Sequence, residues 1–138
     1  MKEDVQNRSI ENKKVFIVED DILYKDILST KLSITGAIII HAENGIDALT
    51  EIPKSIPDVI LLDLLLPGEV DGFGVLEKIK NDPKLKSIPV IIISNLSETK
   101  DLERGMRLGA YRYLVKSMLN LNEIPEYIES ALKSGIKS

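Results

Sequence analysis

The sequence contains no cysteine, no tryptophan and a single histidine among its 138 residues. Without cysteine the chain forms no disulfide and has no thiol chemistry. Zinc sites, which are built mainly from cysteine and histidine, are therefore not expected. The chemistry of this chain has to rest on carboxylates, hydroxyls and amines.

Long apolar runs and clusters of basic residues are missing as well. No run approaches the roughly 20 residues that a membrane-spanning helix needs, and the polar residues 1–8 contain no apolar core of the kind found in a signal peptide. The net charge is −4, whereas phosphate binding in nucleic-acid-binding proteins draws on clustered lysine and arginine. We therefore expect a cytoplasmic protein that contacts neither membranes nor nucleic acid directly, with metal cations or basic partners as its ligands.

Short runs rich in β-branched residues alternate along the chain with segments of helical periodicity. These runs predict strands at residues 14–18, 37–41, 59–62, 90–93 and 111–115. Nearly all-apolar strands separated by amphipathic helices are typical of a parallel sheet that is covered on both faces. The sequence therefore predicts an α/β fold with five βα units in one doubly wound layer.

The helices are predicted from apolar residues at three- and four-residue spacing. Each predicted helix has one apolar set, which in chain order comprises Ile22, Leu23, Ile27, Leu28 and Leu32; Ile46, Leu49 and Ile52; Phe73, Leu76 and Ile79; Leu102, Met106 and Leu108; and Ile124, Ile128 and Leu132. Pro53 is expected to lie beyond the last turn of the second helix. We divide the chain into a flexible lead-in (1–12), one folded domain (13–134) and a polar tail (135–138).

Side chains that can carry chemistry stand at the ends of four predicted strands. They are Glu19, Asp20 and Asp21 after the first strand, Asp63 after the third, Ser94 after the fourth and Lys116 after the fifth. The carboxyl ends of parallel strands meet at one edge of a sheet, where open α/β folds bind ligands. Asp21 directly precedes the first helix, so we expect it to be a helix N-cap rather than a ligand. We expect the other side chains to lie close together.

Three carboxylates at one place, from Glu19, Asp20 and Asp63, repel one another. Two like charges ~4 Å apart cost about 4 kcal/mol at an effective dielectric constant near 20, and a hard divalent cation relieves that cost. Oxygen ligands that leave room for water and a substrate phosphate favour Mg²⁺, with Mn²⁺ as the alternative, over Zn²⁺. A metal-bound carboxylate beside Lys116 is also suited to accept a phosphoryl group, because both cations neutralise the transferring oxygens. Ser94 could donate a hydrogen bond to the same group.

The chain resembles the receiver domain of two-component response regulators in a set of short motifs at these strand ends. The motifs are Val18-Glu19-Asp20-Asp21, Leu62-Asp63 with the later Pro67 and Asp71-Gly72, Ile93-Ser94, and Leu108-Gly109-Ala110 leading to Tyr113-Leu114-Val115-Lys116. The resemblance covers residues 13–134. It implies a flavodoxin-like fold, with a five-stranded parallel sheet in the order 2-1-3-4-5 and five helices.

The resemblance also implies roles for the acids. Asp63 would accept the phosphoryl group, and Glu19 and Asp20 would form the acidic pair of the family. Asp20 would bind Mg²⁺ directly and Glu19 through water, and the backbone carbonyl of Leu65 would complete the metal site. A sensor histidine kinase or a histidine phosphotransfer protein would supply the phosphoryl group.

Three further residues take their expected roles from the same resemblance. Lys116 would bind the phosphoryl group, Ser94 would be the switch hydroxyl, and Tyr113 would be the aromatic residue that changes rotamer when Ser94 moves. The protein would then be no conventional enzyme, although it would catalyse its own phosphorylation and dephosphorylation. As a stand-alone receiver it would signal to a protein target through its fourth helix, fifth strand and fifth helix.

Several positions depart from the family pattern. Ser117 follows Lys116 where the family usually has a proline after a cis peptide, and a cis bond before serine is far costlier, so this loop is expected to be looser or its peptide trans. Asn95 is larger than the very small residue that the family prefers after Ser94. Because Asn95 and Leu65 flank the expected path of water to the acyl phosphate, we expect unusual dephosphorylation kinetics. The loop 67–72 is one residue longer than the usual turn.

Other functions have to be weighed against this one. A phosphohydrolase of the aspartyl-phosphate type would usually carry a second Asp two residues after its nucleophile, and Leu65 stands there instead. A flavodoxin-like nucleotide carrier needs a phosphate-binding loop after its first strand, where acidic residues are electrostatically wrong. The serious alternative is a degenerate receiver that acts as a phosphorylation-independent interaction module. His41, at the end of the second strand, is expected to be structural and away from the acids.

Overall fold

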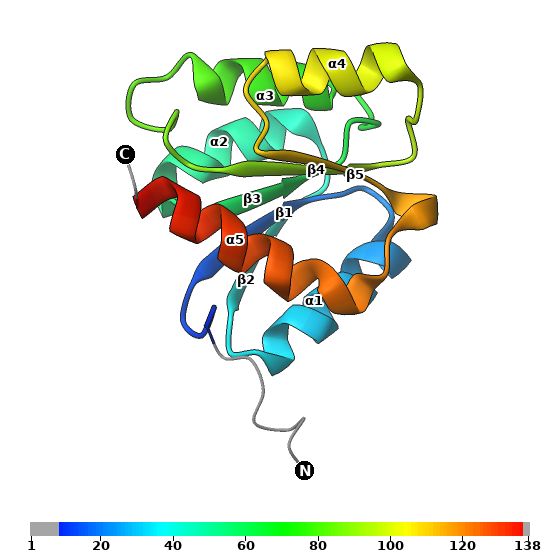
Figure 1. Ribbon diagram of the computed structural model, residues 1–138. Helices are drawn as coiled ribbons and strands as arrows, with labels where there is room; N and C mark the ends of the chain where they lie inside the picture. Colours follow the sequence, from blue (N-terminus) through cyan, green and yellow to red (C-terminus); the bar gives the residue numbers. More distant parts are fainter. Residues whose placement is uncertain (1–8, 137–138) are drawn as a thin grey trace.

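The computed structural model of the protein describes residues 9–136, which form a parallel sheet between two layers of helices (Figure 1). The elements in chain order are β1 (Lys14–Val18), α1 (Ile22–Ile34), β2 (Ile38–Ala42), α2 (Gly45–Ser55), β3 (Val59–Leu62), α3 (Gly72–Lys80), β4 (Val90–Ser94), α4 (Thr99–Arg107), β5 (Arg112–Val115), the 3₁₀ turns η2 (Lys116–Met118) and η3 (Leu121–Glu123), and α5 (Ile124–Ile136). Each predicted strand starts and ends within one residue of an observed strand.

The five strands of the described residues are arranged in the order β2-β1-β3-β4-β5, and every neighbouring pair is parallel. Helices α1 and α5 cover one face of the sheet, and α2, α3 and α4 cover the other (Figure 1). Because helices cover both faces, a central strand can be apolar throughout, and all of β3 is buried. The predicted doubly wound fold with five βα units is therefore confirmed.

The strand order changes direction between β1 and β3, and this point lies at the carboxyl edge where the acids are found. Val18 of β1 pairs with Leu62 of β3, so the residues that follow them, Glu19 and Asp63, leave the sheet side by side. The backbone N–H of Asp63 donates to the carbonyl of Val18 at 3.0 Å. After these residues the chain continues from β1 to α1 on one face of the sheet and from β3 to α3 on the other. Ligand sites of open α/β sheets form where neighbouring strands connect to opposite faces.

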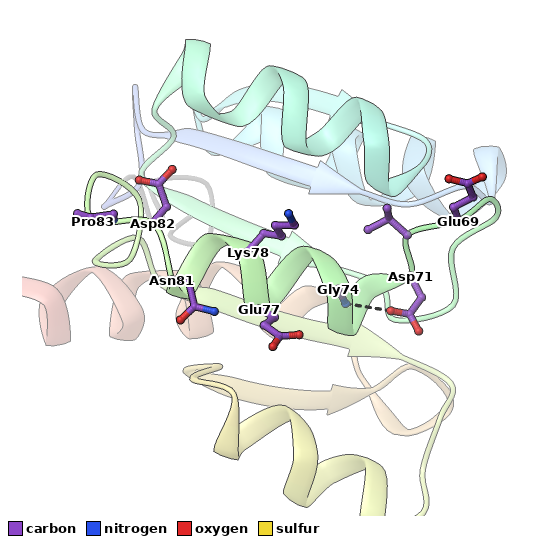
Figure 2. Close-up of a pocket in the computed structure, with 9 residues that line it drawn as sticks. Glu69, Asp71, Gly74, Glu77, Lys78, Asn81, Asp82 and Pro83 are labelled. Carbon is purple, nitrogen blue, oxygen red and sulfur yellow. Dashed lines mark hydrogen bonds between the residues drawn. The ribbon is translucent and has the colours of Figure 1, made fainter.

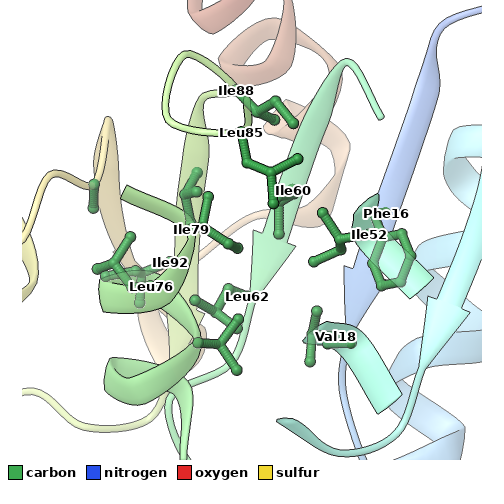
Figure 3. Close-up of a cluster of buried hydrophobic side chains, with 14 of the residues drawn as sticks. Phe16, Val18, Ile52, Ile60, Leu62, Leu76, Ile79, Leu85, Ile88 and Ile92 are labelled. Carbon is green, nitrogen blue, oxygen red and sulfur yellow. The ribbon is translucent and has the colours of Figure 1, made fainter. Parts of the chain in front are cut away.

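The apolar core is divided by the sheet into two clusters. Successive strand residues point to opposite faces, so β1 contributes Phe16 and Val18 to one cluster and Val15 and Ile17 to the other. Figure 3 shows the first cluster, in which Ile52 of α2 packs near Phe16. Burial of each large apolar side chain contributes about 1.5–3 kcal/mol. Because both faces of the sheet carry such side chains, packing on both faces stabilises the strands that carry the site.

The predicted apolar face of α1 is only partly buried. Leu28 and Leu32 lie in the core, whereas Ile22, Leu23 and Ile27 are 49%, 70% and 42% exposed. Successive helix residues are roughly 100° apart, so these five positions spread round more than half of the helix and cannot all face the sheet. The prediction of a single apolar face was wrong for the first turn and a half of α1.

Helix α2 also differs from the prediction, because Pro53 lies inside the helix. Proline lacks the N–H that an interior helix position uses, yet α2 continues to Ser55. Ile56 then adopts a left-handed φ of 45°. It precedes Pro57, whose ring disfavours the helical conformation of the residue before it. The helix therefore ends at the Ile56–Pro57 step and not at Pro53.

The folded part of the chain begins earlier than predicted. Ile10 is fully buried in the cluster on the α1 and α5 side, and the N–H of Asn12 donates to the carbonyl of Gly36 at 2.9 Å. The prediction of a flexible lead-in is thus wrong for residues 9–12, because one isoleucine in a polar segment anchors it to the core. The rest of the predicted lead-in, residues 1–8, lies outside the described residues.

The last helix continues past the predicted domain boundary at residue 134. Helix α5 runs to Ile136, and residues 137–138 of the predicted tail lie outside the described residues. Across residues 9–136, no helix combines the length and apolarity needed to cross a membrane.

Candidate functional site

The predicted acids are brought together at the carboxyl edge of the sheet. Glu19 and Asp20 follow β1 and Asp63 follows β3, and one carboxylate oxygen from each lies within 4.8 Å of the others. Glu19 and Asp63 are only 3% and 4% exposed, whereas Asp20 is open to solvent. An all-oxygen cluster with one accessible member has the donor chemistry of a site for a hard divalent cation.

Lys116 extends from the end of β5 into this acidic cluster. Its Nζ donates to Oε1 of Glu19 at 2.8 Å and to Oδ2 of Asp63 at 2.9 Å, and its side chain is 11% exposed. Among the described residues one ammonium pairs with two of the three carboxylates, so the cluster carries more negative than positive charge when its acids are ionised. The excess negative charge favours the binding of a divalent cation beside the lysine.

Backbone N–H groups hold the remaining oxygens of the two buried acids. The N–H of Asp21 donates to Oε2 of Glu19 at 3.1 Å, and the N–H of Leu65 donates to Oδ1 of Asp63 at 3.1 Å. Each buried carboxylate therefore has one oxygen bound by the backbone and one bound by Lys116. These contacts fix the orientation of both side chains.

Burial and charge shift the protonation of this cluster. Burial, with a smaller contribution from the charge of Asp63, raises the pKa of Glu19 from 4.5 to about 7, although the hydrogen bond from Lys116 opposes the shift. Burial alone would lower the pKa of Lys116, but its hydrogen bonds to Glu19 and Asp63 outweigh that effect and raise it. A charged lysine thus shares the pocket with a glutamate that gains a proton readily.

Ser94 and Tyr113 contact the same backbone segment. Ser94 is fully buried, and its Oγ accepts a hydrogen bond from the N–H of Leu96 at 3.3 Å. The hydroxyl of Tyr113 donates to the carbonyl of Leu96 at 2.8 Å. Burial, together with the charges of Asp101 and Asp63, raises the pKa of Tyr113 to about 12. The two residues are therefore linked through Leu96.

Two residues near the site were missed or misplaced by reasoning from the sequence. The Lys116 Nζ lies over the ring of Tyr24 in α1, 4.3 Å from the centre of the ring. His41 was expected to lie away from the acids, but its Nε2 is hydrogen-bonded to the backbone carbonyl of Glu19 at 3.0 Å, because β2 is the neighbour of β1. An aromatic residue in the first turn of the helix that follows the acids was the available signal for Tyr24.

Three smaller predictions concern the loops around the cluster. Asp21 is the N-cap of α1 and its carboxylate accepts from the N–H of Tyr24 at 3.2 Å, which confirms the predicted cap. All peptide bonds of the described residues are trans, including the one before Ser117. The longer loop, residues 67–72, is packed against the end of β3, since any side chain at Gly72 would collide with the backbone of Asp63 and Leu64.

A broad surface hollow of about 850 Å³ lies along α3 and shares no residue with the cluster (Figure 2). Its charged lining residues are mostly acidic and are Glu69, Asp71, Glu77, Lys78 and Asp82. In Figure 2 the carboxylate of Asp71 accepts from the N–H of Gly74, at 2.9 Å, and so caps α3. The acids of this hollow are therefore accounted for in part by helix capping and by solvation.

The site and fold correspond to a known family. The family model of the response regulator receiver domain matches residues 15–129, a stretch that includes every acid of the cluster and Lys116. The chain therefore belongs to the response regulator receiver domain family and is a domain of two-component signalling.

A curated relative illustrates the context in which such domains occur. The protein described as "Probable transcriptional regulator ycf27" from Guillardia theta is 34% identical over an aligned length of 138 residues, and the alignment covers 96% of this chain and 51% of that protein. The chain spans about half the length of the curated relatives it matches.

Solved structures confirm the fold and the order of its strands. The receiver domain of the Francisella response regulator 1452 has a TM-score of 0.81 and 28% identity, covering 89% of this chain and 98% of that one. The Mn²⁺-bound form of response regulator Rcp1 has a TM-score of 0.73 and 28% identity, covering 86% of this chain and 90% of that one. A similar response regulator thus binds a divalent metal, in keeping with the acidic cluster found here.

Proposed function

We propose that this protein is a phosphorylation-dependent switch that accepts a phosphoryl group on Asp63. The observation that carries the proposal is the position of the Asp63 carboxylate, which is buried, within 4.8 Å of two further carboxylates and 2.9 Å from the Lys116 Nζ. Such a carboxylate is oriented as a nucleophile and has cationic charge beside it.

In the proposed reaction a phosphohistidine of a sensor histidine kinase or of a histidine phosphotransfer protein is the donor. A carboxylate oxygen of Asp63 forms a bond to phosphorus while the P–N bond to the donor breaks. The imidazole leaves with the electron pair of that bond and takes up a proton. Lys116 neutralises part of the charge on the transferring oxygens. We expect this exchange to take place in the cytoplasm.

A divalent cation is part of the proposal. Glu19, Asp20 and Asp63 would hold Mg²⁺ or Mn²⁺, with Asp20 as a direct ligand, Glu19 acting through water and the backbone carbonyl of Leu65 as a further ligand. The donor set supports this assignment, because it consists of oxygens alone and one member is open to solvent. When bound, the cation would supply positive charge to the phosphoryl oxygens.

The proposed switch passes through Ser94 and Tyr113. The Ser94 hydroxyl would move toward the phosphoryl group, and the hydrogen bonds of Ser94 and Tyr113 to Leu96 support a coupled movement. Tyr113 also touches α4, where a side chain at Gly105 would come within 3.1 Å of its ring. A new rotamer of Tyr113 would therefore change the surface formed by α4, β5 and α5, which we propose as the surface that a downstream protein reads.

A degenerate receiver that works without phosphorylation is the second candidate. It is favoured by Ser117, which takes the place of the usual proline after Lys116. The contacts of Lys116 with Glu19 and Asp63 weigh against it, since the lysine reaches both carboxylates across a trans peptide.

The test is intact-mass analysis after incubation with acetyl phosphate, with and without Mg²⁺. We expect the wild type to gain one phosphoryl group only with Mg²⁺, and Asp63→Asn to gain none. Asp58→Asn is the matched control, because it makes the same change just before β3 and should leave the gain intact. A folded wild-type protein that gains no mass under any condition would instead favour the phosphorylation-independent module.

A further inference from the structure

The aromatic ring of Tyr24 is the feature of the site that neither the acids nor the switch explains. Tyr24 lies in the first turn of α1, and the Lys116 Nζ is 4.3 Å from the centre of its ring. The hydroxyl of Tyr24 is buried and has no hydrogen-bond partner among the described residues. Its contribution to the site must therefore come from the ring and not from the hydroxyl.

The ammonium of Lys116 is held by three groups, which come from three different elements. Glu19 from the end of β1 and Asp63 from the end of β3 accept its hydrogen bonds, and Tyr24 from α1 offers its ring. A cation over an aromatic face is attracted by the ring quadrupole, most strongly where water is excluded. With its side chain 11% exposed, Lys116 meets that condition.

Glu19, Asp63 and Tyr24 have different roles in the proposed reaction. Asp63 has to react and Glu19 has to turn toward a metal, so both would loosen their hydrogen bonds to Lys116 during the reaction. The ring of Tyr24 takes part in neither step. Of the three groups that contact the ammonium within residues 9–136, the ring is the one that the proposed steps would leave in place.

We propose that Tyr24 is a positioning residue for Lys116, which it keeps above its ring face and next to the Asp63 carboxylate. The effect on phosphoryl transfer rests on the function proposed above, whereas the contact itself does not. Ser117 supports this role, because the backbone after Lys116 lacks the proline that would restrict its conformation. The ring of Tyr24 supplies that order by its contact with the Lys116 ammonium.

Two variants separate the ring from the hydroxyl. Tyr24→Phe keeps the ring face and removes a buried hydroxyl that has no partner within residues 9–136, so it should leave the Lys116 contact unchanged. Tyr24→Leu keeps an apolar side chain and removes the π face. Tyr127→Leu is the control, because Arg112 lies 4.9 Å over the ring of Tyr127 and the change removes a similar contact outside the cluster.

The first readout does not depend on phosphorylation. The Lys116 Nζ lies over the ring of Tyr24, so we expect ring current to shift the NMR signals of the adjacent methylene protons upfield in the metal-free protein. The signals are assigned by their loss in Lys116→Gln. We expect the upfield shift in the wild type, Tyr24→Phe and Tyr127→Leu, and its absence in Tyr24→Leu.

The second readout is the rate of phosphorylation by acetyl phosphate with Mg²⁺. We expect Tyr24→Leu to be slower by about tenfold, the size of effect that a partly desolvated cation–π contact supports. Tyr24→Phe and Tyr127→Leu should stay within about twofold of the wild type. Thermal melting of each variant shows that the proteins compared are folded.

Three results would contradict the proposed role of Tyr24. An upfield shift that persists in Tyr24→Leu, or an unchanged phosphorylation rate in that variant, would overturn the proposal. It would also be overturned by a Tyr24→Phe protein that is as slow as Tyr24→Leu, because the hydroxyl and not the ring would then matter. A wild type that shows the ring-current shift but takes no phosphoryl group would keep the Tyr24 contact and overturn the proposed function instead.

Discussion

Two acidic regions of this domain look similar in the sequence and differ sharply in the structure. The cluster at the carboxyl edge contains Glu19 and Asp63, which are almost fully buried and share one lysine. The hollow along α3 contains Glu69 and Glu77, which are exposed (Figure 2). Several carboxylates near one another do not make a site by themselves. The first region is distinguished by burial, which makes the charge of its acids costly, and by a lysine that is only 11% exposed and donates hydrogen bonds to two of them. Lys78 of the hollow is exposed.

The largest expected difference between the two regions is chemical. Asp63→Asn should abolish the gain of a phosphoryl group, because an amide oxygen is not a nucleophile for phosphorus under these conditions. Glu77→Gln in the hollow should leave the rate within about twofold of the wild type, since an exposed group outside the cluster contributes little to the transition state. Intact-mass time courses with acetyl phosphate measure both. An equal loss in the two variants would show that the hollow takes part.

The next difference is in stability. Lys116→Gln should lower the free energy of unfolding by roughly 2–3 kcal/mol in chelator, because two buried carboxylates lose their cation. Lys78→Gln in the hollow should change it by less than about 0.5 kcal/mol, as is usual for an exposed side chain. Urea denaturation monitored by circular dichroism compares the two. Added Mg²⁺ should restore part of the loss in Lys116→Gln, and similar losses in both variants would contradict the distinction.

Dependence on pH gives a third comparison. The pKa of Glu19 is about 7 in the folded, metal-free protein and near 4.5 in the unfolded chain. Between these values the folded protein binds more protons than the unfolded chain, so this group's stabilising contribution is full below pH 4.5 and is lost as the pH rises through 7. Glu19→Gln lacks this dependence.

The measurement is the free energy of unfolding in chelator at several pH values. The stability of Glu19→Gln relative to the wild type should increase by roughly 2 kcal/mol from pH 5 to pH 8. Parallel stability curves for the two proteins across that range would show that burial does not hold a proton on Glu19.

The smallest expected effect is the relief of repulsion. Asp63→Asn should raise the free energy of unfolding in chelator by about 1 kcal/mol, because three carboxylates share one ammonium and the change removes one negative charge. Asp58→Asn serves as the control at the other end of β3. A lower melting midpoint for Asp63→Asn than for the wild type would mean that Lys116 already balances the cluster.

Most of the sheet and the acids of the site were predictable, because their signals are local. Apolar runs mark the strands, and a charged residue directly after such a run has to leave the sheet at its edge, as Glu19 and Asp63 do. The mistakes came where local patterns allow several solutions. Pro53 could end α2 or lie inside it, and the apolar residues of α1 could not all face the sheet.

What the sequence alone determined is the order of strands and helices and the set of acids, hydroxyl and lysine at the strand ends. The contact between Tyr24 and Lys116, the hydrogen bond of His41 to Glu19 and the raised pKa of Glu19 were decided only by the tertiary structure. The physical reason is that these features depend on which residues distant in the chain become neighbours and on how much water they exclude. A local pattern can place a residue such as Tyr24 in a helix, but it does not say which distant residue that side chain will contact.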